Sequence, residues 1–166
     1  MTIRILLAAL LLLAACSKQE AALPTPLEPD SNAIAYFCHM SLPEHEGPKV
    51  QAFMRNQDKP YWFASVSEAF VFLQTEPFQP KDLVVVYVND MGQGSWEHPA
   101  AGAWVEIHRA HFVIGSRRTA AMGGTEAVPF AAQAAAEAFV RQFGGQVVDF
   151  DAAAKALAID QQGSAS

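Results

Sequence analysis

The stretch Phe63-Ala-Ser-Val-Ser-Glu-Ala-Phe-Val-Phe-Leu-Gln74 predicts a strand end followed by a helix. Apolar side chains recur at helical spacing between Ser67 and Gln74. Ser65 or Ser67 can cap this helix, because a hydroxyl at the N-cap accepts a hydrogen bond from a free helical N–H. We therefore expect a helix over residues 67–74.

Strands are predicted on both sides of this helix. Residues 49–54 and 60–64 precede it and are separated by a polar turn. Residues 83–88 follow it as a continuous, largely β-branched run, which is typical of a strand buried on both faces. The first half of the chain, residues 36–89, therefore has the order β-β-α-β.

The second half predicts the same order of elements. Residues 103–107 and 111–115 are expected to form a hairpin. Residues 130–143 are alanine-rich and predict a helix that ends at Gly144-Gly145, and residues 146–150 predict the last strand. These elements form a second β-β-α-β unit.

The two helix starts are alike in sequence. Phe63-Ala64 … Glu68-Ala69-Phe70-Val71 is echoed, with unequal spacing, by Phe130-Ala131 … Glu137-Ala138-Phe139-Val140. A chance likeness of two helix starts is the alternative to a duplication. We predict an α+β fold of two ββαβ modules, residues 36–89 and 101–151, divided within residues 89–101.

Residues 1–15 have the features of a bacterial export signal. Arg4 provides a short positive region, residues 5–13 are apolar, and small residues precede Cys16. The apolar run is too short for a membrane-spanning helix, which needs about 20 residues. The motif resembles the lipoprotein signal, in which cleavage leaves Cys16 as the lipidated N-terminus. A plain signal peptide with an incidental cysteine is the alternative.

The expected location is the bacterial periplasm, on a lipid anchor. Ser17 after the lipidated residue favours the outer membrane over the inner membrane. Residues 16–35 contain Pro24, Pro26 and Pro29 and are expected to form a semi-rigid tether with a reach of about 50 Å. Residues 152–166 are expected to form a flexible tail.

The charge of the chain excludes some classes of partner. The formal net charge is −6 and no basic cluster is present, which argues against nucleic acid and against electrostatic docking to anionic lipid. Membrane contact is therefore expected through the acyl chains alone.

The cysteine count restricts what Cys38 can do. The sequence has two cysteines, and the lipid would use Cys16. Cys38 is then without an intramolecular disulfide partner in an oxidising compartment, and no second thiol is available for disulfide exchange. It must be buried, metal-bound or catalytic.

Cys38 and Met40 form a candidate metal motif. If residues 37–41 are extended, both side chains point to the same face, and a thiolate with a thioether selects soft ions such as Cu(I). A buried cysteine beside a core methionine is the alternative. His39 would point to the opposite face unless the backbone turns, and its role stays open.

Met122 is a candidate third sulfur donor. It lies in Ala121-Met-Gly-Gly-Thr-Glu-Ala-Val-Pro-Phe130. The adjacent glycines can take positive φ and indicate a loop before a helix. The alternative is that Met122 fills the edge of the core. The other histidines are expected to be solvated or hydrogen-bonded loop residues; they are His45, His98, His108 and His111.

Two stretches together resemble the NosL family, the copper-binding accessory lipoproteins of nitrous-oxide reductase. They are Phe37-Cys-His-Met-Ser-Leu42 with Glu46-Gly-Pro-Lys49, and Met122-Gly-Gly-Thr-Glu-Ala-Val-Pro-Phe130. The resemblance implies a fold of two ββαβ modules related to organomercurial lyase. It also implies Cu(I) ligands at Cys38, Met40 and Met122, with His39 at a variable position.

The resemblance implies a metallochaperone that delivers Cu(I) to nitrous-oxide reductase through an ABC-type maturation transporter, with no catalysis of its own. The alternative is a thiol-based enzyme, similar to organomercurial lyase, that uses Cys38 as nucleophile. Such an enzyme needs an additional catalytic thiol, which the mature chain lacks. The sequence shows no serine-nucleophile motif and no phosphate-binding glycine loop.

Overall fold

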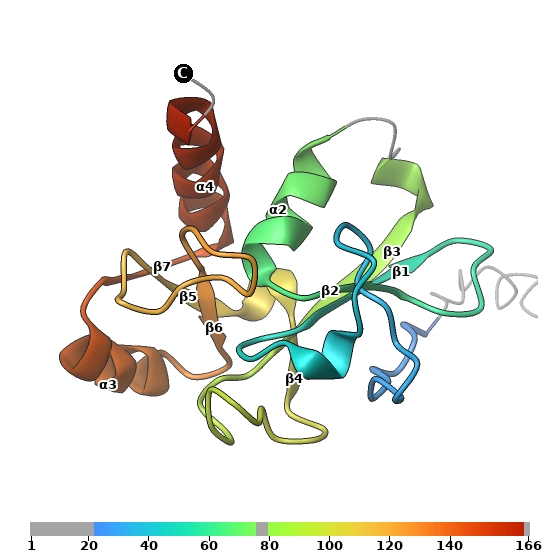
Figure 1. The fold of residues 1–166 in the computed structure, drawn as a ribbon, viewed down its shortest axis with the longest axis horizontal. Helices are drawn as coiled ribbons and strands as arrows, with labels where there is room; N and C mark the ends of the chain where they lie inside the picture. Colours follow the sequence, from blue (N-terminus) through green and yellow to red (C-terminus); the bar gives the residue numbers. More distant parts are fainter. Residues whose placement is uncertain (1–21, 76–79, 165–166) are drawn as a thin grey trace, which may run out of the picture.

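The computed structural model describes residues 22–75 and 80–164 and contains two antiparallel sheets (Figure 1). The larger sheet has the order β2-β1-β3-β4, and the smaller has the order β6-β5-β7. The strands are β1 (Val50–Met54), β2 (Tyr61–Phe63), β3 (Leu83–Asn89), β4 (Trp104–Glu106), β5 (His111–Ile114), β6 (Val128–Phe130) and β7 (Gln146–Val148). The helices are α2 (Val66–Gln74), α3 (Gln133–Phe143) and α4 (Phe150–Ser164), with short 3-10 turns η1 (Leu42–Glu44), η2 (Pro80–Asp82) and η3 (Ile107–Arg109).

The first predicted β-β-α-β unit is confirmed by β1, β2, α2 and β3. Of the two predicted caps, Ser65 is the N-cap of α2, and its side chain accepts from the Glu68 N–H. The Glu68 carboxylate in turn accepts from the Ala64 N–H at 3.1 Å. This reciprocal arrangement satisfies two backbone donors and fixes the point at which the chain leaves β2 and enters α2.

The hairpin predicted over residues 103–107 and 111–115 is wrong. β4 pairs with β3 in the larger sheet, and β5 pairs with β6 and β7 in the smaller one. The turn η3 between β4 and β5, capped by the Glu106 side chain, diverts the chain from one sheet to the other. The helix predicted over residues 130–143 begins only at Gln133. Val128–Phe130 is an edge strand, a position that tolerates the missing N–H of Pro129.

The order strand, strand, helix, strand nevertheless occurs in both sheets. β5, β6, α3 and β7 follow one another as β1, β2, α2 and β3 do, and the central strand is the first in each case. The second unit therefore begins at His111 rather than near residue 101. That the two units arose by duplication stays a prediction.

One apolar core joins the two sheets, with α2 between them (Figure 1). Phe70 of α2 contacts Phe112 of β5 at 5.7 Å between ring centroids and stacks on Phe150 of α4 at 5.1 Å. β5 is buried on both faces: Phe112 and Ile114 face this core, and Val113 faces α3. The two units are therefore not independent hydrophobic domains.

The predicted flexible tail over residues 152–166 is wrong for its greater part. Phe150–Ser164 forms α4, and Ala153 and Leu157 are buried in the main core. Asp149 precedes the helix and accepts from the Ala152 N–H at 2.9 Å, which caps its first turn. None of the described helices is both long enough and apolar enough to cross a membrane.

The described part of the predicted tether lies against the larger sheet. We call residues 23–29 the N-terminal strap. The fully buried Gln51 side chain bonds both the N–H and the C=O of Leu27, at 2.9 and 3.0 Å. The Tyr87 hydroxyl donates to the Pro24 carbonyl, and Glu28 accepts from the Trp104 indole N–H. The strap is therefore part of the folded domain and not a free spacer.

A buried carboxylate connects the second unit to the N-terminus of α2. Glu126 is only 1% exposed and accepts from the Ser67 N–H at 3.1 Å, the Ala127 N–H at 2.9 Å and the Val66 N–H at 3.4 Å. The Ser67 hydroxyl also donates to Glu126 and to the Thr125 carbonyl. Burial raises the pKa of Glu126 to about 7, although these donors favour its ionised form.

We expect Gln51→Ala to release the N-terminal strap. The substitution removes two hydrogen bonds made by a fully buried side chain and should lower the free energy of unfolding by about 1–3 kcal/mol. Urea denaturation measures the loss, and limited proteolysis near Leu27 measures the release. Gln57→Ala, at an exposed turn, is the control. Equal protease resistance in both variants would contradict the role assigned to Gln51.

We expect Glu126→Gln to flatten the pH dependence of stability. The pKa of Glu126 is higher in the folded state than in the unfolded state, so its contribution is present below the unfolded value and is lost as the pH rises through about 7. Urea denaturation near pH 5 and near pH 8 should show a smaller loss in the variant than in the wild type. The exposed Glu137→Gln should behave like the wild type. A parallel loss in all three proteins would contradict this assignment.

Candidate metal centre

Cys38 lies at the tip of a short hairpin, and not on a strand. We call residues 34–41 the Cys38 hairpin; a bridge between Ile34 and Ser41 closes it. Inside it the Ala35 N–H donates to the Met40 carbonyl and the His39 N–H to the Ala35 carbonyl, each at 3.0 Å. His39 has φ of 55°, in the left-handed region. The expectation that residues 37–41 are extended is therefore wrong. Strand geometry then gives no reason for Cys38 and Met40 to point to the same face.

The Cys38 hairpin is fixed on the edge strand β2. Ala35 forms a parallel bridge with Trp62, and the Tyr36 N–H donates to the Trp62 carbonyl at 2.7 Å. The Tyr36 ring packs against Tyr61 and Phe72 at 5.0 and 5.4 Å between centroids. The hairpin is therefore held against β2 and α2 by backbone hydrogen bonds and ring contacts.

The Cys38 thiol is half-buried in a small apolar cluster. The cluster contains Ala33, Ala35, Leu42 and Ala64, with Trp62 and Ala121 packed against it. The Cys38 sulfur lies 3.8 Å from the Nε2 atom of His45. Of the two roles expected for the loop histidines, solvated or hydrogen-bonded, His45 has the second, since it is half-buried and faces the thiol. It lies seven positions after Cys38, a spacing that is only a weak zinc pattern, so local sequence does not single it out.

A short motif after His45 holds this residue in place. The Gly47 N–H donates to the Trp96 carbonyl at 2.7 Å, and the buried Lys49 ammonium donates to the Gly47 carbonyl at 2.6 Å. A Cβ at Gly47 would lie 3.0 Å from the Trp96 ring, and φ there is +80°, so only glycine fits without strain. Burial lowers the pKa of Lys49 to about 8, against the opposite influence of Glu126 and Glu46.

The Glu68 carboxylate lies close enough to His45 to be influenced by its charge. Burial raises the pKa of Glu68, while the Ala64 N–H and the charge of His45 act in the opposite direction. Glu68 also closes the cap of α2, so the same side chain belongs both to the helix start and to the surroundings of the thiol. Two ionisable side chains, Glu68 and His45, therefore lie in the surroundings of the thiol.

The two candidate methionines are exposed. Met40 is 46% exposed and Met122 is 59% exposed. Neither is a core residue, so the alternatives in which they only fill the core do not hold. Ile34 and Phe37 of the Cys38 hairpin are also large exposed apolar residues, and His39 is exposed. The surface around the thiol is therefore apolar and contains thioether sulfur.

Met122 is carried by a second hairpin beside the first. We call residues 119–125 the Met122 loop; a bridge between Thr119 and Thr125 closes it. Gly123 and Gly124 have φ of 87° and 80°, as the adjacent glycines predicted. Ala121 packs against the cluster that contains Cys38. The structure therefore brings the Met122 loop next to the Cys38 hairpin, across more than 80 residues of sequence.

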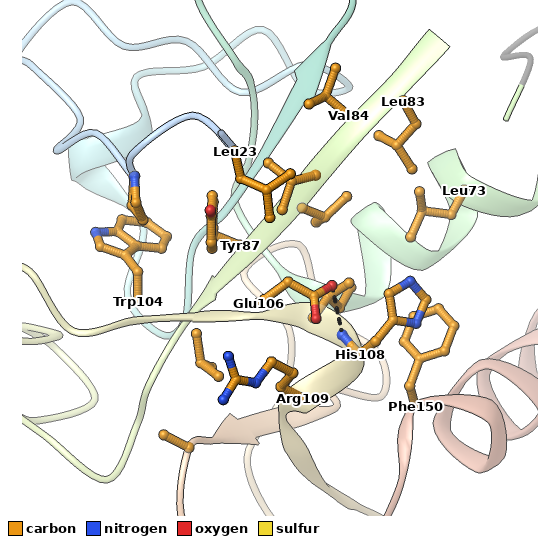
Figure 2. A pocket seen from close by; sticks show the side chains of 16 residues that line it. Leu23, Leu73, Leu83, Val84, Tyr87, Trp104, Glu106, His108, Arg109 and Phe150 are labelled. Carbon is orange, nitrogen blue, oxygen red and sulfur yellow. Dashed lines mark hydrogen bonds between the residues drawn. The ribbon is translucent and has the colours of Figure 1, made fainter. Parts of the chain in front are cut away.

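A separate groove runs along β3 and β4. It has a volume of about 860 Å³, and its lining includes Leu23, Tyr87, Trp104 and Phe150 but none of the three candidate sulfur ligands (Figure 2). His108 lies against the Phe150 ring at 4.2 Å between centroids. Among the described residues, no three or more Cys, His, Asp or Glu side chains gather as they do in a zinc centre.

Comparison with known proteins identifies relatives of this chain. It is 39% identical to the copper-binding lipoprotein NosL of Achromobacter cycloclastes, over 85% of this chain and 74% of that protein. It is 32% identical to the NosL of Stutzerimonas stutzeri, over 74% of this chain but only 62% of that protein.

A solved structure has the same fold. The crystal structure of the copper chaperone NosL from Shewanella denitrificans matches with a TM-score of 0.69 and 32% identity, over 77% of this chain and 95% of that one. The sequence profile of the NosL family matches residues 26–158. The resemblance seen in the two sequence motifs is therefore confirmed, and the chain belongs to the NosL family.

Proposed function

We propose that this protein is a lipid-anchored copper chaperone that holds one Cu(I) ion with Cys38, Met40 and Met122. The observation that carries the proposal is the arrangement of two neighbouring hairpins. One carries the half-buried thiol of Cys38 and the exposed Met40, and the other carries the exposed Met122. Methionines at 46% and 59% exposure contribute little to the core, and they lie near the thiol together with the exposed side chains of Ile34 and Phe37. Membership of a family whose named members bind copper supports the same reading.

The donor set suits Cu(I) better than harder ions. A thiolate with two thioethers forms a low-coordinate soft site, which favours Cu(I) over zinc. The thiol must lose its proton when the metal binds. The Nε2 atom of His45 lies 3.8 Å from the Cys38 sulfur. Its imidazole is a further donor available to the ion.

The exposure of the thioethers fits a transfer function. A partner that approaches the exposed apolar side chains of Ile34 and Phe37 can offer its own donors and replace Met40 and Met122 one at a time. Cys38, deeper in its cluster, would be the last ligand to leave. In this proposal the ion goes to the copper centres of nitrous-oxide reductase through an ABC-type maturation transporter.

The proposed location is the periplasm, with Cys16 as the lipidated residue and the outer membrane favoured over the inner. Named relatives are lipoproteins, which supports a lipid anchor. Because the N-terminal strap is bonded to the sheet from Pro24 to Glu28, the domain stays closer to its anchor than a free tether of residues 16–35 would allow.

A thiol enzyme is the second candidate, and one contact favours it. A cysteine within reach of a histidine is the arrangement of an activated nucleophile, and the Cys38–His45 distance of 3.8 Å approaches it. Cleavage of an organomercurial needs a further catalytic thiol, and the sequence holds only Cys16 besides Cys38. Incubation of the purified protein with a phenylmercury salt separates the two candidates: repeated release of benzene would support the enzyme.

We expect Cys38→Ser to abolish tight Cu(I) binding and Met122→Leu to weaken it. Loss of the thiolate should lower the affinity by more than about 100-fold, which exceeds the usual cost of losing an outer partner of a ligand. Anaerobic titration against a competing Cu(I) chelator measures both affinities. Met91→Leu, a methionine packed near α3, is the matched control. Wild-type affinity in Cys38→Ser would exclude the site as a whole, whereas wild-type affinity in Met122→Leu would remove only this ligand.

We expect a strain that carries Cys38→Ser to make nitrous-oxide reductase that is exported but short of copper. Cytoplasmic or medium copper in excess can bypass a chaperone, so the strain must be grown at limiting copper. The measurement is the copper content per reductase polypeptide, with Met91→Leu as the control strain. A fully loaded reductase in the Cys38→Ser strain would exclude the delivery role even if the purified protein binds copper.

A further inference from the structure

The tip of the Met122 loop has little packing of its own. Met122 is 59% exposed, and a Cβ added at Gly123 or Gly124 would meet no atom within 4 Å. Ala121 is the residue of the tip that packs against the Cys38 cluster. The position of the methionine therefore depends on the two ends of the loop, which the bridge between Thr119 and Thr125 joins, and Glu126 follows directly at the second end.

That junction is fixed by α2. The Glu126 carboxylate accepts from three backbone N–H groups, two of them in the first turn of α2, and from the Ser67 hydroxyl. The Ser67 hydroxyl also donates to the Thr125 carbonyl. A negative side chain is favoured at a helix N-terminus by the free N–H groups and by the helix dipole. The closing residue of the Met122 loop is thus bonded directly to the helix.

The residues just before the same helix also pack around Cys38. Ala64, two residues before α2, belongs to the apolar cluster of the thiol, and its N–H donates to Glu68 at 3.1 Å. Ser65 and Glu68 lock this turn by mutual capping. A short path of contacts therefore leads from Cys38 through Ala64 and α2 to Glu126 and the Met122 loop.

We infer that Glu126 is a positioning residue for the metal centre: it holds the Met122 loop at the distance from the Cys38 hairpin at which both sulfurs reach one ion. The inference rests on the proposed function, because it assigns a role toward copper that the proposed ligands would perform. Glu126 does not touch the ion, and it acts only through Met122.

A double-mutant cycle between Glu126 and Met122 tests this role. Glu126→Ala should weaken Cu(I) binding roughly 10- to 100-fold, as does loss of other residues that orient metal ligands. In the Met122→Leu background the same change should cost almost nothing further, because the residue it positions is gone. X-ray absorption should show one sulfur neighbour fewer around copper in Glu126→Ala than in the wild type.

Two further variants separate positioning from general destabilisation. Glu126→Gln keeps an acceptor for the α2 N–H groups and should restore most of the affinity. Val128→Ala creates a cavity in the separate apolar cluster that includes Ala136 of α3. It should lower stability but leave the Cu(I) affinity and the sulfur count unchanged. If Glu126→Ala does not fold, Ser67→Ala replaces it in the cycle, since it removes the bonds to Glu126 and Thr125 alone.

Three results would overturn the inference. They are wild-type affinity in Glu126→Ala or its Ser67→Ala substitute, losses that add fully in the double variant, and an affinity in Met122→Leu equal to that of the wild type. The first two leave the proposed function intact, and the third removes only Met122 from its ligand set. The proposed copper site as a whole fails only if Cys38→Ser binds Cu(I) as tightly as the wild type. The two failures are therefore distinguishable in one set of titrations.

Discussion

The interaction on which the structure depends is the hydrogen bonding of the α2 N-terminus by side chains from both units. Within the first unit, Ser65 and Glu68 cap the helix locally; from the second unit, Glu126 reaches the next free N–H groups. Burying a carboxylate is costly unless its hydrogen bonds are satisfied, so this residue is stable only while both units keep their relative position. The capped helix start is also bonded to Thr125 at the end of the Met122 loop, and Ala64 just before it packs in the cluster of Cys38.

The site combines a rigid base with an exposed tip. The Cys38 hairpin is bonded to the edge strand β2, and the Met122 loop rises from β5 and β6, so neither base can move without disturbing a sheet. The methionines themselves are exposed and make few contacts. This division suits a protein that must bind an ion firmly enough to select it and release it to a partner that approaches from solvent.

The N-terminal strap, which its composition predicts to be a linker, packs on the outer face of the larger sheet. Gln51, Tyr87 and Trp104 lie on three different strands, and each bonds the N-terminal strap at a different residue. The proline-rich composition predicts a semi-rigid spacer. Because a stiff segment loses little conformational entropy when it is fixed on the sheet, these few hydrogen bonds can hold it there. The same composition is compatible with a free tether, and only the partners on the sheet decide between the two.

The sequence by itself determined what depends on neighbouring residues: the strands and helix of the first unit, the cap at Ser65, the positive φ of Gly123 and Gly124, and the family. It also selected Cys38, Met40 and Met122 as candidates, although its reason, an extended Cys-x-Met segment, was wrong because His39 turns the backbone. Only the tertiary structure decided that β4 belongs to the larger sheet, that residues 150–164 are helical, and that His45 and Glu126 adjoin the site. These features depend on hydrogen bonds and packing between residues distant in sequence, which no local period or propensity encodes.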